Sequence, residues 1–147
     1  MSPSVGGGAR VHARAERRLS LSLPAAPELF PALRGFLGEV LAARGLRDRE
    51  VGQVTLVVQE AVTNLHRHAY GGAAGSVRLE VAFRDDAVEL LLEDRGPPFD
   101  PTGVALRPLD SSAEGGRGIA LMRTLMDEIR YERRGSRNRL TLVKRRS

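Results

Sequence analysis

Hydrophobic residues recur at every second position in some segments of this chain and three or four positions apart in others. The order in which these segments follow one another fits few architectures. Strict alternation of apolar and polar residues predicts strands, and apolar residues spaced three and four apart predict helices. The predicted segments are, in order, a strand at 18–23, helices at 28–43 and about 49–69, strands at 77–83 and 88–92, a helix at 119–126, and strands at 128–134 and 139–144. Because strands and helices do not simply alternate, a doubly wound parallel sheet is disfavoured. The order favours an α+β two-layer sandwich, with helices on one face of a mixed, mostly antiparallel sheet.

The residues between the predicted segments are typical of turns and helix ends. Gly45 is placed to stop the first helix, and Asp48 is a good N-cap for the second. Asp85 with Asp86 forms the turn of the first hairpin, and Gly135 opens the turn of the last one. The glycine- and proline-rich stretch between the two hairpins has no hydrophobic period, and loops of that length are usually functional or disordered.

The chain has 147 residues, which fits one domain of ordinary size. Residues 1–17 are glycine-rich and polar, so we expect a disordered basic tail followed by a single domain at 18–147. The absence of cysteine excludes a disulfide framework, a cysteine zinc site, an iron–sulfur cluster and thiol catalysis. No stretch reaches the roughly 18 apolar residues of a membrane helix, and no secretory signal is recognisable. We therefore expect a cytoplasmic protein that makes no membrane contact.

The net charge of +5 is concentrated at the two ends of the chain. Residues 1–18 carry four arginines against one glutamate, and residues 128–147 carry eight basic and two acidic side chains. Basic ends of this kind can contact nucleic acid or an acidic protein surface, or they can be solvated flanks. Aromatic residues make up only 4% of the chain, so it has few side chains on which nucleic-acid bases could stack. We expect no direct nucleic-acid contact.

The predicted helix at about 49–69 carries polar residues on a face that is separate from its apolar stripe. The stripe consists of Val51, Val54, Val58, Val62 and Leu65. Glu60, Asn64 and His68 are spaced four apart, so they stack along another face. A carboxylate can accept a proton from a hydroxyl, and an amide oxygen suits Mg²⁺. The alternative is that Glu60 pairs with Arg67 or another arginine while Asn64 points outward.

Two further segments have a composition suited to binding a ring and an anion. Asp94 follows a strand and precedes Gly96, so its carboxylate can accept a hydrogen bond from an amino group on a flat ring. Gly115, Gly116 and Gly118 precede a predicted helix, where backbone N–H groups and the helix dipole favour a phosphate. Each segment taken singly is also typical of a plain turn.

Together the three segments resemble the three ATP-binding boxes of the GHKL, or histidine-kinase-like, ATPase superfamily. The boxes read Glu60-x-x-x-Asn64-x-x-x-His68-Ala-Tyr70, then Asp94-x-Gly96 with Phe99-Asp100-Pro101, then Gly115-Gly116-x-Gly118. The nearest resemblance is to the anti-sigma-factor serine kinases, and it runs from about Leu19 to Lys144. It implies helices on one face of a mixed sheet, with ATP bound between the helices and a lid.

The resemblance also implies a role for each matching residue. Asn64 would hold the Mg²⁺ that bridges the phosphates, and Glu60 would be the base that takes the proton from the attacking serine. Asp94 would bind the adenine amino group, with Gly96 giving it room. Thr141 would support the adenine from the last strand.

The remaining matches concern the lid and the phosphates. Backbone N–H groups would face the phosphates from the lid glycines Gly115, Gly116 and Gly118. His68 closes the first box and is counted with the nucleotide-binding candidates. Two departures stand out: Pro98 replaces the second glycine of the usual Asp-x-Gly-x-Gly box, and the only candidate cation near the phosphates is Arg117, since no lysine is there.

The family's chemistry defines the expected activity and partners. The resemblance implies an Mg-ATP-dependent protein-serine kinase that phosphorylates an antagonist protein and sequesters an RNA polymerase sigma factor, with a homodimer as the common assembly. The two departures motivate an alternative, an ATP-binding regulatory module without kinase activity. The basic ends leave a nucleic-acid binder as a third possibility, which a steep salt dependence would reveal.

Overall fold

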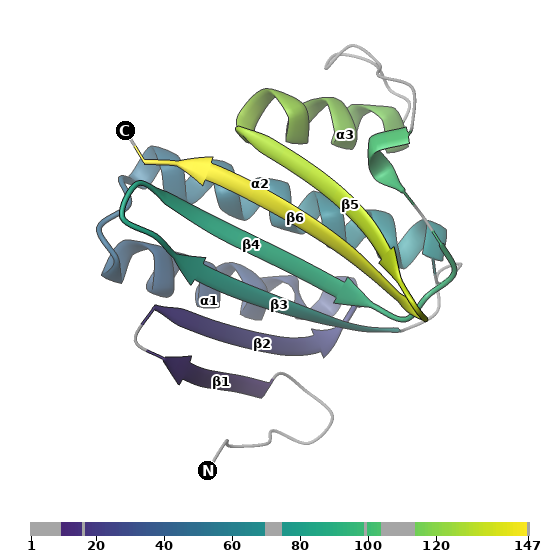
Figure 1. The fold of residues 1–147 in the computed structure, drawn as a ribbon, viewed down its shortest axis with the longest axis horizontal. Coiled ribbons are helices and arrows are strands. Elements are labelled where there is room, and N and C mark those ends of the chain that lie inside the picture. Colours follow the sequence, from purple (N-terminus) through teal and green to yellow (C-terminus); the bar gives the residue numbers. More distant parts are fainter. Residues whose placement is uncertain (1–9, 16, 70–74, 99, 104–113, 147) are drawn as a thin grey trace.

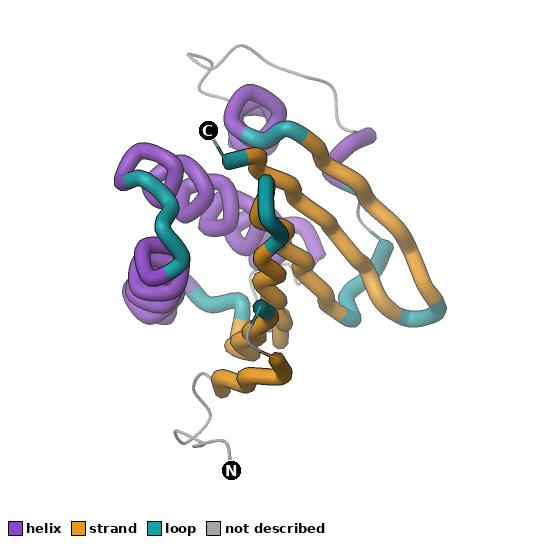
Figure 2. The backbone as a smooth tube through the Cα atoms, turned by 60° about the vertical axis from the view of Figure 1, so that its left-hand side comes forward, coloured by secondary structure: helices purple, strands orange, loops and turns teal. Residues whose placement is uncertain are grey.

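A computed structural model of the chain describes residues 10–15, 17–69, 75–98, 100–103 and 114–146. In these residues, three α-helices lie on one face of a six-stranded sheet (Figure 1). Figure 2 shows the two layers edge-on, with the helices together on one side of the strands. The expected α+β two-layer sandwich is confirmed. No helix in the described ranges is long and apolar enough to cross a membrane.

Apart from β1, the described elements match the predicted order. The strands are β1 (Arg10–Ala15), β2 (Arg18–Pro24), β3 (Ser76–Phe83), β4 (Ala87–Asp94), β5 (Glu128–Arg134) and β6 (Arg137–Arg145). The α-helices are α1 (Phe30–Ala43), α2 (Asp48–Asn64) and α3 (Glu114–Leu125). Short 3-10 turns cover Pro27–Leu29 and Pro101–Gly103, and a π-helical turn, Leu65–Ala69, extends α2. The two predicted hairpins and the two long helices are therefore confirmed.

The sheet has the strand order β1-β2-β3-β4-β6-β5. Every pairing among the described strands is antiparallel, so the sheet is not mixed as the sequence analysis expected. The register sets Leu79 beside Leu92, and Leu92 beside Leu140, on the face that the helices cover. Two residues further along these strands, Asp94 of β4 pairs with Asn138 of β6 on the same face. This pairing puts two polar side chains next to the apolar leucines, at the end of β4.

The core lies between the sheet and the helices. Three side chains of α1, Leu33, Leu37 and Leu41, are completely buried. Of the predicted stripe on α2, Val54, Val58 and Val62 are buried, while Val51 and Leu65 are half-buried and pack against the core. Each fully buried side chain of this size contributes about 1.5–3 kcal/mol to folding. This packing fixes the rotation of α2 and therefore the direction in which its polar face points.

The predicted disordered tail is wrong for Arg10–Ala15. These residues form β1, which pairs with β2 at the edge of the sheet with Val11 opposite Leu21 and Ala13 opposite Leu19. The alternating positions of this strand hold one valine and two alanines, which is a weak hydrophobic signal. An edge strand is held mainly by the backbone of its neighbour, so it forms without a strong pattern of its own. Residues 1–9 lie outside the described residues.

The ends of the two long helices differ from the prediction at one point. Gly45 has φ +84°, in the left-handed region, and ends α1 as expected. Asp48, predicted as the N-cap of α2, is instead the first residue of that helix, and Arg47 is the N-cap. The Arg47 backbone N–H donates to Glu50 Oε1 at 3.1 Å. A carboxylate three residues into the helix therefore performs the capping that was assigned to Asp48.

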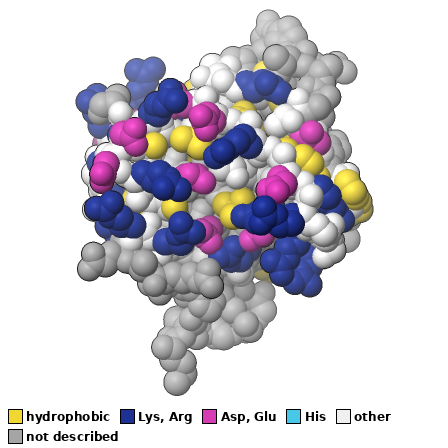
Figure 3. Space-filling model, viewed as in Figure 1, with side chains coloured by type: hydrophobic (Ala, Val, Ile, Leu, Met, Phe, Trp, Pro, Cys, Tyr) yellow, Lys and Arg dark blue, Asp and Glu magenta, His cyan; other side chains and the backbone are white. Residues whose placement is uncertain are grey.

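The other face of the sheet is covered by charged side chains rather than by helices. Figure 3 shows basic and acidic groups interleaved across it. Glu80 accepts from Arg18 at 2.7 Å and from Arg78, and Arg78 also donates to Glu93 at 2.6 Å. Glu93 lies 3.7 Å from Arg139 as well. These pairs link β2, β3, β4 and β6, so part of the basic C-terminal segment is engaged in ion pairs within the sheet.

Candidate functional site

The polar face of α2 meets the start of α3 at a single glycine. A Cβ built on Gly118 would lie 2.9 Å from Glu60 Oε2, and 3.8 and 3.9 Å from the Nδ2 and Oδ1 atoms of Asn64. The first distance is shorter than a carbon and an oxygen tolerate, so a residue with a side chain at 118 would displace the carboxylate. Three predicted site residues from two segments of the chain are thus brought together.

Glu60 is half-buried and makes no ion pair or hydrogen bond with any residue that the structure describes. Among the described side chains, which do not include that of Arg117, Glu60 therefore pairs with no arginine. A carboxylate held beside a helix without a partner is available to accept a proton or to contact a ligand.

Asn64 is the most unusual polar residue of this group. It is 4% exposed, and its Nδ2 is a buried donor without a hydrogen-bond partner in the described part of the chain. A buried polar group left unsatisfied costs about 1–3 kcal/mol. Such a group in a native fold calls for an explanation, and a ligand oxygen that completes its hydrogen bonding is the simplest one.

A second polar cluster lies at the far end of β4. Asp94 is 5% exposed, and its Oδ1 accepts from the Gly96 backbone N–H at 2.8 Å and from Asn138 Nδ2 at 3.0 Å. Gly96 is buried against it. The predicted pair of Asp94 and Gly96 is therefore a tight turn in which the carboxylate binds the backbone two residues on.

One cavity connects the two clusters. Asn64 lines it from α2 and Asp94 lines it from β4, with an apolar floor between them. The other lining residues are Ala61, Leu65, Leu92, Pro101, Met122, Tyr131, Asn138 and Leu140. Its volume is about 20 Å³, room for about one water molecule. An apolar pocket with a few convergent polar groups is the usual form of a small-molecule site.

The third predicted box lies inside a helix rather than before one. The sequence predicted a helix from 119, but α3 begins at Glu114, so Gly115, Gly116 and Arg117 lie in its first turn. A glutamate at a helix N-terminus interacts favourably with the dipole, which offsets the cost of the glycines that follow. The first backbone N–H groups of a helix have no partner within it, so the expected source of anion-binding groups is retained. The Arg117 side chain lies outside the described residues.

Two further predicted residues belong to the last strand and to the first box. Thr141 pairs with Leu91 and Arg130, on the face of the sheet opposite Leu140 and Asn138. The strand alternation therefore points Thr141 away from the cavity, and its assignment beside the adenine is wrong. His68 lies in the π-helical turn that follows Asn64, and its side chain is outside the described residues.

The residue that does accompany Asp94 is Asn138, to which the sequence analysis gave no role. Tyr131 and Arg133 of β5 also reach this group, since both donate to Asn138 Oδ1. The missing information was the pairing of β4 with β6, which decides that position 138 rather than 141 faces Asp94. Had the register of β6 against β4 been known, it would have identified Asn138 as the partner of Asp94.

Comparison with known proteins agrees with this geometry. Residues 23–144 match the family described as the histidine kinase-like ATPase domain. Serine-protein kinase RsbW of Bacillus pumilus (strain SAFR-032) is 32% identical over 126 residues, covering 78% of this chain and 77% of the relative. The RsbW protein of Bacillus subtilis (strain 168) is 32% identical over 123 residues, with the same two coverages. The RsbW protein of Staphylococcus epidermidis is 31% identical over 121 residues, 76% of each chain.

One solved structure shows the same fold. The crystal structure of the RsbU and RsbW domains of Rv1364c from Mycobacterium tuberculosis superposes with a TM-score of 0.62 and 22% identity. The match covers 88% of this chain but only 32% of that longer chain.

The matched region spans both polar clusters and the cavity between them, so the chain belongs to the histidine kinase-like ATPase domain family. Within that family it belongs with the anti-sigma-factor serine kinases, the group of the RsbW proteins.

Proposed function

We propose that this protein is an Mg-ATP-dependent protein-serine kinase that phosphorylates an antagonist protein and sequesters an RNA polymerase sigma factor. The observation that carries the proposal is the placement of Glu60 and Asn64 against Gly118, with Asn64 also lining the cavity that Asp94 lines from β4. The names of the RsbW relatives, which are serine-protein kinases, support the reaction class.

The roles follow from the chemistry of each side chain. Asp94 accepts a hydrogen bond from the amino group of the base, because an ionised carboxylate is an acceptor only. Glu60, which with Asn64 lies against Gly118, accepts the proton of the attacking serine hydroxyl. Phosphoryl transfer depends mainly on positioning and charge neutralisation. The nucleotide therefore lies with its base at Asp94 and its phosphates towards Glu60.

Asn64 fits the phosphate end of the nucleotide and its metal ion. Its oxygen is a hard, neutral ligand of the kind that Mg²⁺ takes together with waters and phosphate oxygens. Its buried Nδ2, without a partner among the described residues, would donate to a phosphate oxygen. When bound, Mg²⁺ would neutralise the charge of the phosphates. Because the cavity is far smaller than a nucleotide, its lining must move apart for ATP to enter.

The alternative of an ATP-binding regulatory module without kinase activity rests on the phosphate end. The chain's single lysine, Lys144, donates to the Leu125 carbonyl at the C-terminus of α3 and is therefore engaged elsewhere. Pro98 occupies the position of a glycine in the usual second box. A site that binds ATP without transferring its phosphate would retain the roles of Asp94 and Asn64 but not that of Glu60.

The two functions differ in one measurable product. The purified protein is incubated with Mg-ATP and an antagonist protein, and the mass of the antagonist is followed. A kinase adds one phosphate to a serine, and Glu60→Gln reduces the rate by about 10²-fold or more while ATP affinity remains near the wild-type value. An unmodified antagonist, with ATP bound normally by the kinase, would establish the module instead.

We further propose that the protein acts in the cytoplasm as a homodimer, as the resemblance implies. Sedimentation of the purified protein with and without a sigma factor tests the assembly. A dimer that takes up the sigma factor supports the proposal, and a monomer at all concentrations contradicts it.

A further inference from the structure

The hairpin of β5 and β6 holds the loop that follows β4 through two side chains. Arg133 Nη1 donates to the Gly96 carbonyl at 2.8 Å and to Asn138 Oδ1 at 3.2 Å. The Arg133 Nε donates to the Gly135 carbonyl at 3.1 Å, which ties the guanidinium to the hairpin turn. Asn138 Nδ2 also lies 3.3 Å from the Gly96 carbonyl. The loop is therefore anchored to a pair of hydrogen-bonded strands.

Asn138 has no hydrogen-bonding capacity left for a ligand. It is 3% exposed. Its Nδ2 donates to Asp94 Oδ1 at 3.0 Å and to the Pro97 carbonyl at 2.9 Å. Its Oδ1 accepts from the Tyr131 hydroxyl and from Arg133. An amide has two N–H donors and two acceptor lone pairs, so these four bonds use them all and permit only this orientation of the amide.

The same contacts leave the two carboxylate oxygens of Asp94 in different states of hydrogen bonding. Oδ1 accepts from the Gly96 N–H and from Asn138, whereas Oδ2 accepts from no residue that the structure describes. The carboxylate plane is therefore fixed, with one oxygen engaged and one free on a residue that lines the cavity. A carboxylate that cannot rotate presents an acceptor in one direction and nothing that donates.

We propose that Arg133 and Asn138 are positioning residues that make the cavity selective for a base carrying an exocyclic amino group. This inference rests on the proposed function. The brace, meaning Arg133 and Asn138 together, holds Asp94 so that its free oxygen meets an amino group and repels a carbonyl oxygen at the same place. A site that leaves a buried polar group unpaired rejects the wrong ligand strongly, provided that the group cannot turn away.

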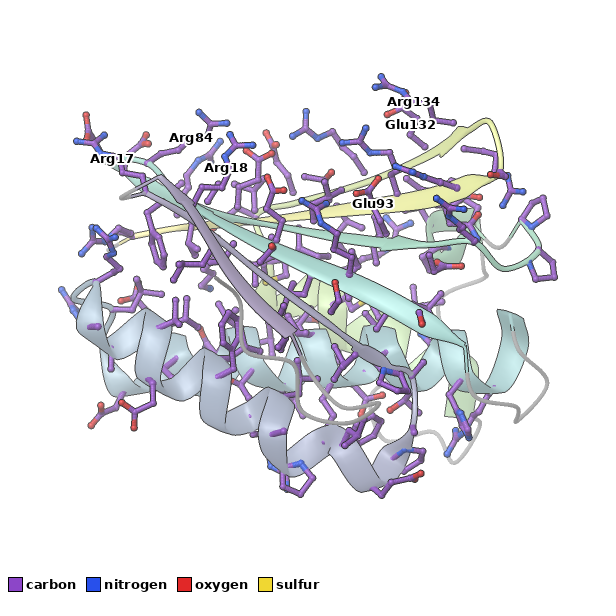
Figure 4. All side chains as sticks on the ribbon, turned by 90° about the horizontal axis from the view of Figure 1, so that it is seen from below. Arg17, Arg18, Arg84, Glu93, Glu132 and Arg134 are labelled. Atoms are coloured by element: carbon purple, nitrogen blue, oxygen red, sulfur yellow. The ribbon has the colours of Figure 1, made fainter. Side chains whose placement is uncertain are left out.

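Arg133 is the residue to change, because it is exposed and acts only through its partners. Arg133→Gln removes the bonds to Gly96 and Asn138 and leaves Asp94 intact. The matched control is Arg134→Gln. Arg134 is the next residue of β5, it pairs with Glu132 at 3.1 Å, and Figure 4 shows both side chains on the side of the sheet away from the helices.

The experiment measures the Kd of ATP and of inosine triphosphate, whose base carries a carbonyl oxygen in place of the amino group, by calorimetry with Mg²⁺. We expect Arg133→Gln to weaken ATP binding about fivefold, the effect of one lost hydrogen bond, and to leave inosine triphosphate unchanged. The ratio of the two affinities therefore falls about fivefold, whereas in Arg134→Gln it stays at the wild-type value.

Three results would overturn the inference, and they are distinguishable. An unchanged ratio in Arg133→Gln shows that the brace does not set selectivity. An equal loss of both nucleotides shows that Arg133 only supports the fold of the loop. If the wild-type protein binds neither nucleotide, the proposed function fails and the inference fails with it.

Discussion

At the scale of the residue, the site is defined by polar atoms that have no partner within the described part of the chain. Glu60 has no cationic partner in the described part of the chain, and Asn64 Nδ2 is buried without an acceptor. A Cβ at Gly118 would lie 2.9 Å from Glu60 Oε2, so only glycine leaves that carboxylate where it is. None of these three features adds to stability, and the unsatisfied Asn64 donor costs free energy in the folded chain. They are consistent with a site whose missing partners arrive with the ligand.

Gly118→Ala is expected to disable phosphoryl transfer without unfolding the protein. The added methyl group would displace the Glu60 carboxylate, and a misplaced base costs on the order of 10²-fold in rate. Gly52→Ala in α2 is the matched control, because a Cβ at that position meets nothing within 4 Å. That change should stabilise the helix by about 0.5–1 kcal/mol. Equal transfer rates in the two variants would contradict the account of Gly118.

Asn64→Leu is expected to separate stability from binding. Leucine has a similar volume and no unsatisfied donor, so the free energy of unfolding should rise by about 1 kcal/mol. Mg-dependent ATP binding should be lost in the same variant. Thermal unfolding and calorimetric titration check the two effects, and a fall in stability with binding retained would refute the reading of Asn64 as a ligand residue.

At the scale of the element, hydrophobic periodicity predicted those helices and strands that bury one regular apolar face. The predicted segment at 49–69 corresponds to α2 and its π-helical turn, because its valines recur on one face that the sheet buries. The predicted α3 began late because glycines dilute its first turn. β1 was missed because small residues carry a weak pattern.

The site was predictable only in part, for the same reason. The spacing of Glu60 and Asn64 belongs to one helix and can be read from the sequence. The partner of Asp94 depends on which strands pair and in what register, which is a tertiary property. Thr141 was therefore chosen where the antiparallel register places Asn138.

The N-terminus of α2 offers a test at this scale. Glu50→Ala removes the acceptor of the Arg47 N–H and should lower the free energy of unfolding by about 1 kcal/mol. Asp48→Ala loses only a favourable charge near the helix dipole, typically about 0.3–1 kcal/mol. Denaturant unfolding compares the two, and a larger loss for Asp48→Ala would restore the N-cap that the sequence analysis assigned to it.

At the scale of the whole molecule, the sheet separates two environments. Its helix-covered face carries the core and, at one end, the cavity where α2, β4 and β6 meet. Its other face carries a network of ion pairs centred on Glu93. Charges on this face can therefore be altered without changing the groups that line the cavity.

Glu93→Gln tests that separation. The carboxylate is 13% exposed and lies 2.6 Å from Arg78, 3.7 Å from Arg139 and 3.9 Å from Arg137, so its loss leaves three arginines close together. We expect a loss of about 1–3 kcal/mol in stability, reduced at high salt, with ATP affinity unchanged. Glu132→Gln is the control, since its pair with Arg134 is largely exposed and worth about 0–1 kcal/mol. Loss of ATP binding in Glu93→Gln would show that the two faces are coupled.

The central claim is that one nucleotide spans the cavity from Asp94 to Asn64, and calorimetric titration with ATP tests it most directly. The wild-type protein and Asp94→Asn are titrated with and without Mg²⁺. The account predicts Mg-dependent binding by the wild-type protein that Asp94→Asn loses, because the amide presents a donor where the base needs an acceptor. Equal binding by both proteins, or none by the wild-type protein, would contradict it.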